Sequence, residues 1–299
     1  MAKVSARQSD TIPQSPFFSL VVPTVGRQTE VAALLHSIET AAISDIEVII
    51  VDQNCDDRLA EICRKYAERF PLIHLKVQFK GASRARNYGA RLASGTVVNF
   101  PDDDCELTAD YLCRAKTFFK DRRGKVLTGI CADRSGNPST SRFVLDERPL
   151  TPWSMWGRMI EFTMFLDRQT FLATGGFDEQ FGVGAEFGSD EAPELLIRLL
   201  RSVEQGQVHY SHRLRCFHPN NARNFSPAGV TRAYTYSKGS GALLAKAPSL
   251  PVVVRSASLI ARAAVAGLIY KGDKGRYYRA RVAGFVDGFR AYKLIGGRP

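Results

Sequence analysis

The sequence predicts an α/β fold in which a mostly parallel central sheet is flanked by helices on both faces. Two observations predict it. Short apolar runs alternate with amphipathic segments whose apolar residues recur at helical spacing, a pattern typical of parallel sheets. In addition, residues with distinctive chemistry directly follow three of the apolar runs, namely Pro23-Thr24, Asp52 and the acidic triplet at 102–104. Ligands bind at the carboxyl ends of strands in such sheets, so we expect these three points to share one site.

The predicted strands are β-prone apolar runs. They span residues 17–22, 46–51, 72–77, 96–100 and 125–131, with further candidates at 159–166, 208–210 and 214–217. The predicted helices begin after residues that can act as N-caps. They span 30–40 after Thr29, from Asp56 or Asp57 to 70, 82–93, from Thr108 to 120, a short segment from Asp167 or Thr170, and 191–204. Residues 132–156 and the glycine-rich 175–188 are expected to be loops.

The chain has 299 residues, of which 44% are apolar, enough for one large α/β domain with an extension. Residues 1–16 are polar and predict a disordered leader. We expect the α/β domain over 17–225 and a basic helical extension over 226–299. Six cysteines without a paired C-x-x-C spacing indicate reduced thiols in the cytoplasm.

The formal net charge is +11, and the basic residues are concentrated in the last third of the chain. Residues 201–299 hold seventeen lysines and arginines against three acids. This excess predicts an anionic partner: phosphates, nucleic acid or anionic lipid. Only the sequence 276–279 interleaves basic and aromatic residues, and no known nucleic-acid module is present, so nucleic-acid binding is disfavoured. A dinucleotide oxidoreductase is also disfavoured, because no G-x-G-x-x-G follows the first strand.

The stretch 252–270 is the most apolar part of the chain, but Arg255 and Arg262 interrupt it. Because ordinary spanning helices tolerate few charges, we do not predict a transmembrane segment. Two alternatives stay open. The C-terminal helices form an interfacial amphipathic pair on a membrane, or they pack on the domain as a hairpin with their basic residues facing water.

Three consecutive carboxylates, Asp102, Asp103 and Asp104, follow the strand predicted at 96–100. Adjacent carboxylates repel each other, and a divalent cation is the common reason for bringing them to one point. An acidic turn in water is the alternative. The upstream Arg86 and Asn87, on a predicted helix, favour a site for a cation and a phosphate.

Five segments, taken together and in this order, resemble the family 2 glycosyltransferases, which have the Rossmann-like GT-A fold and are common in bacterial surface-polysaccharide synthesis. The segments are FSLVVPTVGR, VIIVDQN, GASRARNYGARLASG, VVNFPDDD and GGFDEQFG. The resemblance covers about residues 17–219, with a weaker similarity at 236–246. It implies an inverting, metal-dependent transfer of a sugar from a nucleotide-diphosphate donor.

The resemblance also implies roles for individual residues. Pro23 and Thr24 would shape the nucleotide pocket, and Asp52 would hydrogen-bond the base. The remaining donor-side residues are Arg27, Arg86, Asn87, Asp102 and Asp103, of which Asp102 would bind the ribose or the sugar. Asp104 would coordinate Mg²⁺ or Mn²⁺, with His218 as a further metal contact.

The acceptor side departs from the family pattern. The family has an acidic pair at the start of the helix after GGFDE, and here Glu191 matches the first acid while Ala192 stands where the second is usual. Either Glu191 or Asp190 is therefore the base, with Glu191 favoured, or catalysis is impaired. We expect the helix N-terminus to lower the pKa of this carboxylate. A purely structural role, in which both acids only cap the helix, is the alternative.

The leading functional hypothesis is therefore a glycosyltransferase that acts on a lipid-linked or oligosaccharide acceptor. It would work in the cytoplasm, peripherally at the inner face of the plasma membrane, where the basic extension would hold it on anionic lipid. The alternative is a sugar-nucleotide-binding or scaffold protein of the same pathway, inactivated by Ala192.

Overall fold

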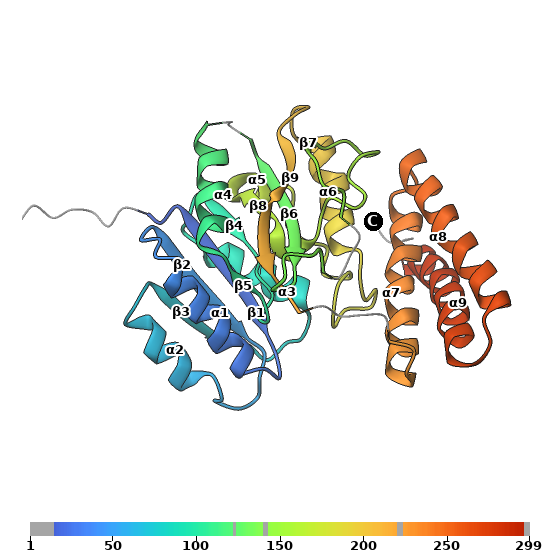
Figure 1. Cartoon of the computed structure of the whole chain (residues 1–299), viewed down its shortest axis with the longest axis horizontal. Coiled ribbons are helices and arrows are strands. Elements are labelled where there is room, and N and C mark those ends of the chain that lie inside the picture. Colours follow the sequence, from blue (N-terminus) through green and yellow to red (C-terminus); the bar gives the residue numbers. More distant parts are fainter. Residues whose placement is uncertain (1–14, 122–123, 140–142, 220–223, 296–299) are drawn as a thin grey trace, which may run out of the picture.

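The computed structural model describes residues 15–121, 124–139, 143–219 and 224–295, so the leader predicted over 1–16 lies almost wholly outside the described residues. Within these ranges nine strands form one sheet with helices on both faces (Figure 1). Eight of the strands follow the order β3-β2-β1-β4-β8-β6-β9-β5, and β7 pairs with β9.

The elements alternate along the chain much as predicted. The strands are β1 (Phe18–Thr24), β2 (Ile46–Asp52), β3 (Leu72–Lys76), β4 (Val97–Asn99), β5 (Glu106–Leu107), β6 (Val126–Ala132), β7 (Glu147–Pro149), β8 (Phe165–Asp167) and β9 (Val208–Phe217). The helices are α1 (Thr29–Thr40), α2 (Ala60–Ala67), α3 (Ala82–Leu92), α4 (Ala109–Asp121), α5 (Arg168–Ala173), α6 (Glu191–Ser202), α7 (Pro227–Lys246), α8 (Leu250–Ile269) and α9 (Gly272–Ile295), with a 3-10 turn η1 at Glu161–Thr163.

The sheet is parallel in its first half and mixed as a whole. Strands β1 to β4 pair in parallel, whereas β8 lies antiparallel between β4 and β6. The α/β fold is thus as predicted, but antiparallel pairs occur alongside the parallel ones. The strand predicted at 159–166 is wrong in its first part, because residues 161–163 form η1 before β8 begins.

Three other local predictions need correction. The segment 132–156, expected to be a loop, contains strand β7, which pairs with β9. The helix expected from Asp56 or Asp57 to residue 70 is shorter, spanning Ala60–Ala67 with Leu59 at its N-cap. The two short strands predicted at 208–210 and 214–217 are a single strand, β9. Its pairing with β6 is irregular between Thr128 and Ile130, where a Cβ on Gly129 would lie 2.2 Å from the Leu214 carbonyl oxygen.

Alternate residues of the buried strands enter two separate cores, as period-2 geometry requires. Val21 and Ile49 pack in one core with α3, α5 and α6, and Leu20 and Val48 pack in the other with α1, α2 and α4. Helices α7 to α9 lie together at one end of the molecule, with α6 between them and the sheet (Figure 1). Ala242 and Leu243 of α7 belong to the first core, so the extension is packed on the domain.

Candidate active site

The carboxyl ends of β1, β2 and β4 meet at one edge of the sheet. Thr24, the last residue of β1, lies opposite Asp52, the last residue of β2. Strand β4 pairs with the other side of β1, and the acidic triplet follows its end after Phe100 and Pro101. The parallel arrangement therefore brings together the three predicted points of polar chemistry.

Each carboxylate of the triplet has its own cationic or polar partner. Asp102 accepts a hydrogen bond from Arg86 at 2.7 Å. Asp103 accepts one from the Thr24 hydroxyl at 2.7 Å and lies 3.3 Å from Arg27. Asp104 lies 2.5 Å from Arg27 and 3.2 Å from the Nε2 atom of His218. The repulsion expected within the triplet is thus compensated by two arginines and a histidine.

Burial and these contacts shift the pKa values of Asp103, Asp104 and His218 in different directions. Burial raises the pKa of Asp103 to about 6, although Thr24 and Arg27 oppose the rise. Burial also acts to raise the pKa of Asp104, but His218 and Arg27 outweigh it, and the pKa lies below its ordinary value. Burial acts to lower the pKa of His218, but the nearby Asp104 has the larger effect, so the pKa of His218 is raised.

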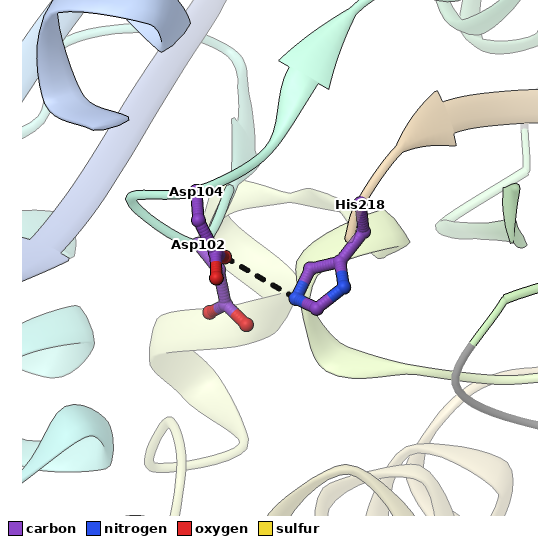
Figure 2. A group of neighbouring side chains, drawn as sticks. All are labelled: Asp102, Asp104 and His218. Carbon is purple, nitrogen blue, oxygen red and sulfur yellow. Dashed lines mark ion pairs between the residues drawn. The ribbon is translucent and has the colours of Figure 1, made fainter. Parts of the chain in front are cut away.

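His218 reaches the site from the end of β9 and is held in a defined orientation. Its ring stacks on Phe162 at a centroid distance of 4.9 Å, and its Nδ1 lies 2.8 Å from the Pro219 carbonyl oxygen. This leaves Nε2 facing the triplet, and Figure 2 shows the side chains of Asp104 and His218 pointing toward each other beside Asp102.

The side chains of Asp102, Asp104 and His218 can serve together as ligands of one divalent cation. One potential ligand atom of each lies within 4.8 Å of the others, the only such group among the described residues. The two carboxylates suit Mg²⁺ or Mn²⁺, and the imidazole favours a transition metal such as Mn²⁺ over Mg²⁺. The donor set fits the cation that was predicted, with Asp102 joining the two expected ligands.

Asp52 organises the loops around the predicted nucleotide pocket. It is fully buried, and one carboxylate oxygen accepts two hydrogen bonds of 2.8 Å from the backbone and side chain of Asn54. The other oxygen lies 2.9 Å from His74 Nε2. Asn54 in turn accepts a bond of 2.6 Å from the Gly26 amide. Sequence reasoning missed Asn54 and His74, although His74 lies in a predicted strand adjacent to β2.

Arg86 and Asn87 are neighbours on α3 but contact different parts of the site. Arg86 is buried and joins Asp102 to Glu191, whose Oε1 lies 3.5 Å from its Nη1. Asn87 instead exchanges two hydrogen bonds of 2.8 Å with the backbone of Phe177 and donates a third, of 3.1 Å, to Glu179. Asn87 therefore holds the GGFDE loop in place.

Glu191 begins α6 and is 5% exposed. The backbone at the helix N-terminus acts to lower its pKa, as expected, but the net shift is upward. Burial raises the pKa of this carboxylate, although Arg86 and the backbone oppose the rise. Ala192, the residue that departs from the family pattern, is buried in the core beside it.

Asp190 faces the helical extension. Its carboxylate accepts hydrogen bonds from Ser240 of α7 at 2.6 Å and from Ser189 at 2.9 Å, and it lies 3.3 Å from Arg255 of α8. It is the N-cap residue of α6 by position, but its side chain makes no capping hydrogen bond.

Sequence reasoning missed Glu161, on η1. Burial raises the pKa of this carboxyl to about 8, and the negative charge of Glu191 adds to the shift. Burial also raises the pKa of Tyr236 on α7, and the negative charges of Glu161 and Glu191 raise it further. A signal for Glu161 existed, because it is the sole acid between Glu147 and Asp167 and is flanked by apolar residues.

A family model described as Glycosyl transferase family 2 matches residues 19–177, just over half of the chain. The chain belongs to glycosyl transferase family 2. Minor teichoic acid biosynthesis protein GgaB of Bacillus subtilis (strain 168) is 27% identical over 113 residues, which are 36% of this chain and 13% of GgaB. This family 2 chain thus corresponds to a small part of that relative.

Two solved structures share the fold of this family 2 chain. Residues 1–349 of S. aureus TarS superpose with a TM-score of 0.62 at 17% identity, covering 94% of this chain and 91% of that one. The mannosyltransferase PcManGT of Pyrobaculum calidifontis, solved in complex with GDP-Man and Mn²⁺, gives a TM-score of 0.62 at 16% identity, covering 96% and 89%. The predicted family and GT-A fold are confirmed.

Proposed function

We propose that this protein is an inverting, metal-dependent glycosyltransferase that uses a nucleotide-diphosphate sugar. One observation carries the proposal. The buried Arg86 contacts Asp102 of the candidate metal group on one side and Glu191 on the other, so donor and acceptor chemistry meet at one guanidinium. The structure of PcManGT with GDP-Man and Mn²⁺ supports this class of donor.

The residues divide the reaction between them. Asp102, Asp104 and His218 would hold Mg²⁺ or Mn²⁺, which would neutralise charge on the diphosphate. Pro23, Thr24, Arg27, Asp52 and Asp103 would line the nucleotide side, with Asn87 holding the adjoining loop.

Glu191 is the proposed general base. It would accept the proton of the acceptor hydroxyl as that oxygen bonds to the anomeric carbon and the bond from this carbon to the diphosphate breaks. A single displacement of this kind inverts the anomeric centre. The raised pKa of Glu191 makes it a stronger base than an exposed glutamate.

We further propose a lipid-linked or oligosaccharide acceptor in surface-polysaccharide synthesis, at the inner face of the plasma membrane. The similarity to a teichoic acid biosynthesis protein supports the pathway. Helix α8 supports the location, since it is the one described helix long and apolar enough to cross a bilayer, and only 22% of its apolar window is buried. Because α8 is packed beside α7 and α9, we propose peripheral docking on anionic lipid.

The exposed apolar residues of α8 form a stripe along one face of the helix. They include Leu250, Val254, Val265, Leu268 and Ile269. Basic residues lie just beyond the stripe, at Lys271, Lys274 and Arg276. A lipid surface with anionic headgroups is complementary to both features.

The catalytic proposal is tested by screening sugar nucleotides with Mn²⁺ for thermal stabilisation and for turnover. The wild type should respond to at least one donor with both. Asp104→Ala should lose the metal-dependent stabilisation, and Glu191→Gln should keep it while turnover falls about 10²–10⁴-fold. Asp110→Ala, an exposed acid on α4, is the control. Full turnover by Glu191→Gln would show that another group is the base.

A further inference from the structure

The three residues before Glu191 are docked on the helical extension. The Ser189 hydroxyl donates a hydrogen bond of 2.7 Å to the Tyr236 carbonyl oxygen of α7. At Gly239 of α7 the two backbones approach closely, because a Cβ there would lie 2.4 Å from the Ser189 carbonyl oxygen. The chain that leads into α6 is therefore seated directly on α7.

Asp190 is the centre of this contact and has an unusual backbone conformation. Its φ of 67° lies in the left-handed region, which a residue with a side chain adopts at a cost of roughly 1–3 kcal/mol. Such a conformation persists where surrounding contacts impose it. Its carboxylate is 7% exposed and is held by Ser240 at 2.6 Å and Arg255 at 3.3 Å. Both of these partners belong to the extension.

Arg255 is itself fixed from the domain side. Its guanidinium carbon lies 4.3 Å from the centre of the Trp156 ring, a distance typical of a cation–π contact. Trp156 lies in the connection between β7 and η1. Arg255 is thus held between an aromatic ring of the domain and the carboxylate that precedes the proposed base.

We propose that Asp190, Ser240 and Arg255 form a positioning group through which helices α7 and α8 place Glu191 for proton transfer. The inference rests on the proposed function for the identity of the base. Asp190 sets the backbone from which α6 starts, and Glu191 is the next residue, with Arg86 as its partner. In this proposal the extension supports catalysis by positioning Glu191, without contacting the donor.

Steady-state kinetics of Ser240→Ala and Arg255→Gln test the proposal. Each change should lower kcat about tenfold while the KM for the donor stays within twofold. Arg255→Lys, which keeps a cation near Asp190, should retain more kcat than Arg255→Gln. The controls are Ser258→Ala and Arg262→Gln, since these two residues bond to each other on α8. They should leave kcat unchanged.

Amide hydrogen exchange of the full chain gives a second readout that needs no turnover. Ser240→Ala and Arg255→Gln should speed exchange in the first turn of α6, at residues 191–195, and leave its last turn unchanged. Unaltered exchange in that turn, or unaltered kcat in a protein that turns over, overturns the positioning role. Lack of turnover and of nucleotide binding by the wild type would instead refute the proposed function, and the exchange result would still decide this inference.

Discussion

Arg86 shows how strongly a single buried residue can depend on its neighbours. Its side chain is 2% exposed, and the charges of Asp102, Glu161 and Glu191 surround it. Burial acts to lower the pKa of Arg86, but these three carboxylates more than compensate, and the pKa is raised. An unpaired charge is costly to bury. Removing either Arg86 or its carboxylate partners would therefore leave an uncompensated buried charge and destabilise the fold.

Glu161 makes a prediction at this scale because its carboxyl titrates in an unusual range. Its pKa is about 8 in the folded protein and near the ordinary 4.5 when unfolded. Between these values the native state holds the extra proton, so the free energy of unfolding falls as pH rises from about 4.5 to 8. Glu161→Gln stays neutral, and its gain in Tm over the wild type should be small at pH 5 and grow toward pH 8.

Differential scanning fluorimetry across this range in chelator-treated protein measures the gain. Glu147→Gln, an exposed glutamate on β7, should give a flat difference. A gain for Glu161→Gln that does not change with pH would contradict the assigned pKa.

At the scale of the element, α8 has two faces with different partners. Val252, Ser256 and Ala263 are buried, while Leu250, Val254 and Leu268 are exposed. An apolar groove of about 370 Å³ lies between α8 and α9, lined by Ala263, Ala264, Gly267, Leu268, Arg279, Val282 and Ala283. The inner face packs against α7 and α9, and the outer face is the one we propose for the lipid surface.

Vesicle binding tests the outer face. Leu268→Glu with Ile269→Glu should lower the partitioning of the protein onto phosphatidylglycerol vesicles at least tenfold, because burying a leucine side chain is worth about 1.5–3 kcal/mol. Wild-type binding should also weaken as salt increases. Leu145→Glu, which changes another exposed leucine on the domain, should have no effect. If the double variant binds vesicles as well as the wild type does in a sedimentation assay, α8 is not the surface that contacts lipid.

At the scale of the whole molecule, partly buried ion pairs as well as apolar packing hold the extension on the domain. Lys246 at the end of α7 lies 2.6 Å from Glu194 of α6 and also pairs with Asp178 of the GGFDE loop. Glu194 is 2% exposed and is also bonded by Arg198. The boundary after residue 225 stays a prediction, and the parts on its two sides share one core.

Lys246→Met should lower the free energy of unfolding by about 1–3 kcal/mol, because the change removes one cation from two partly or fully buried carboxylates while Arg198 still pairs with Glu194. Lys238→Met is the matched control on α7. Its partner Glu186 is half exposed, and such a pair contributes at most about 1 kcal/mol. Urea unfolding of both variants measures the difference. Equal losses in the free energy of unfolding would mean that the ion pairs of Lys246 contribute no more than a surface ion pair does.

The residues of the candidate site were predictable to different degrees. The triplet was predicted because strand ends and acidic runs are local features of the sequence, and His218 was predicted from the resemblance to the family. Asp52, Asn87 and Asp190 were identified as site residues, but their partners, Asn54, the Phe177 backbone and Ser240, follow only from long-range packing. Glu161 was missed because its neighbours Glu191 and Arg86 lie far from it in sequence.

By itself the sequence determined the alternating elements, the α/β fold, the family and the acidic edge of the sheet, because hydrophobic period and strand-end chemistry are local. Only the tertiary structure decided which strands are antiparallel, that burial outweighs the helix N-terminus and raises the pKa of Glu191, and that Asp190 faces the extension. These properties depend on which surfaces the packed chain removes from water and on which distant charges it brings together.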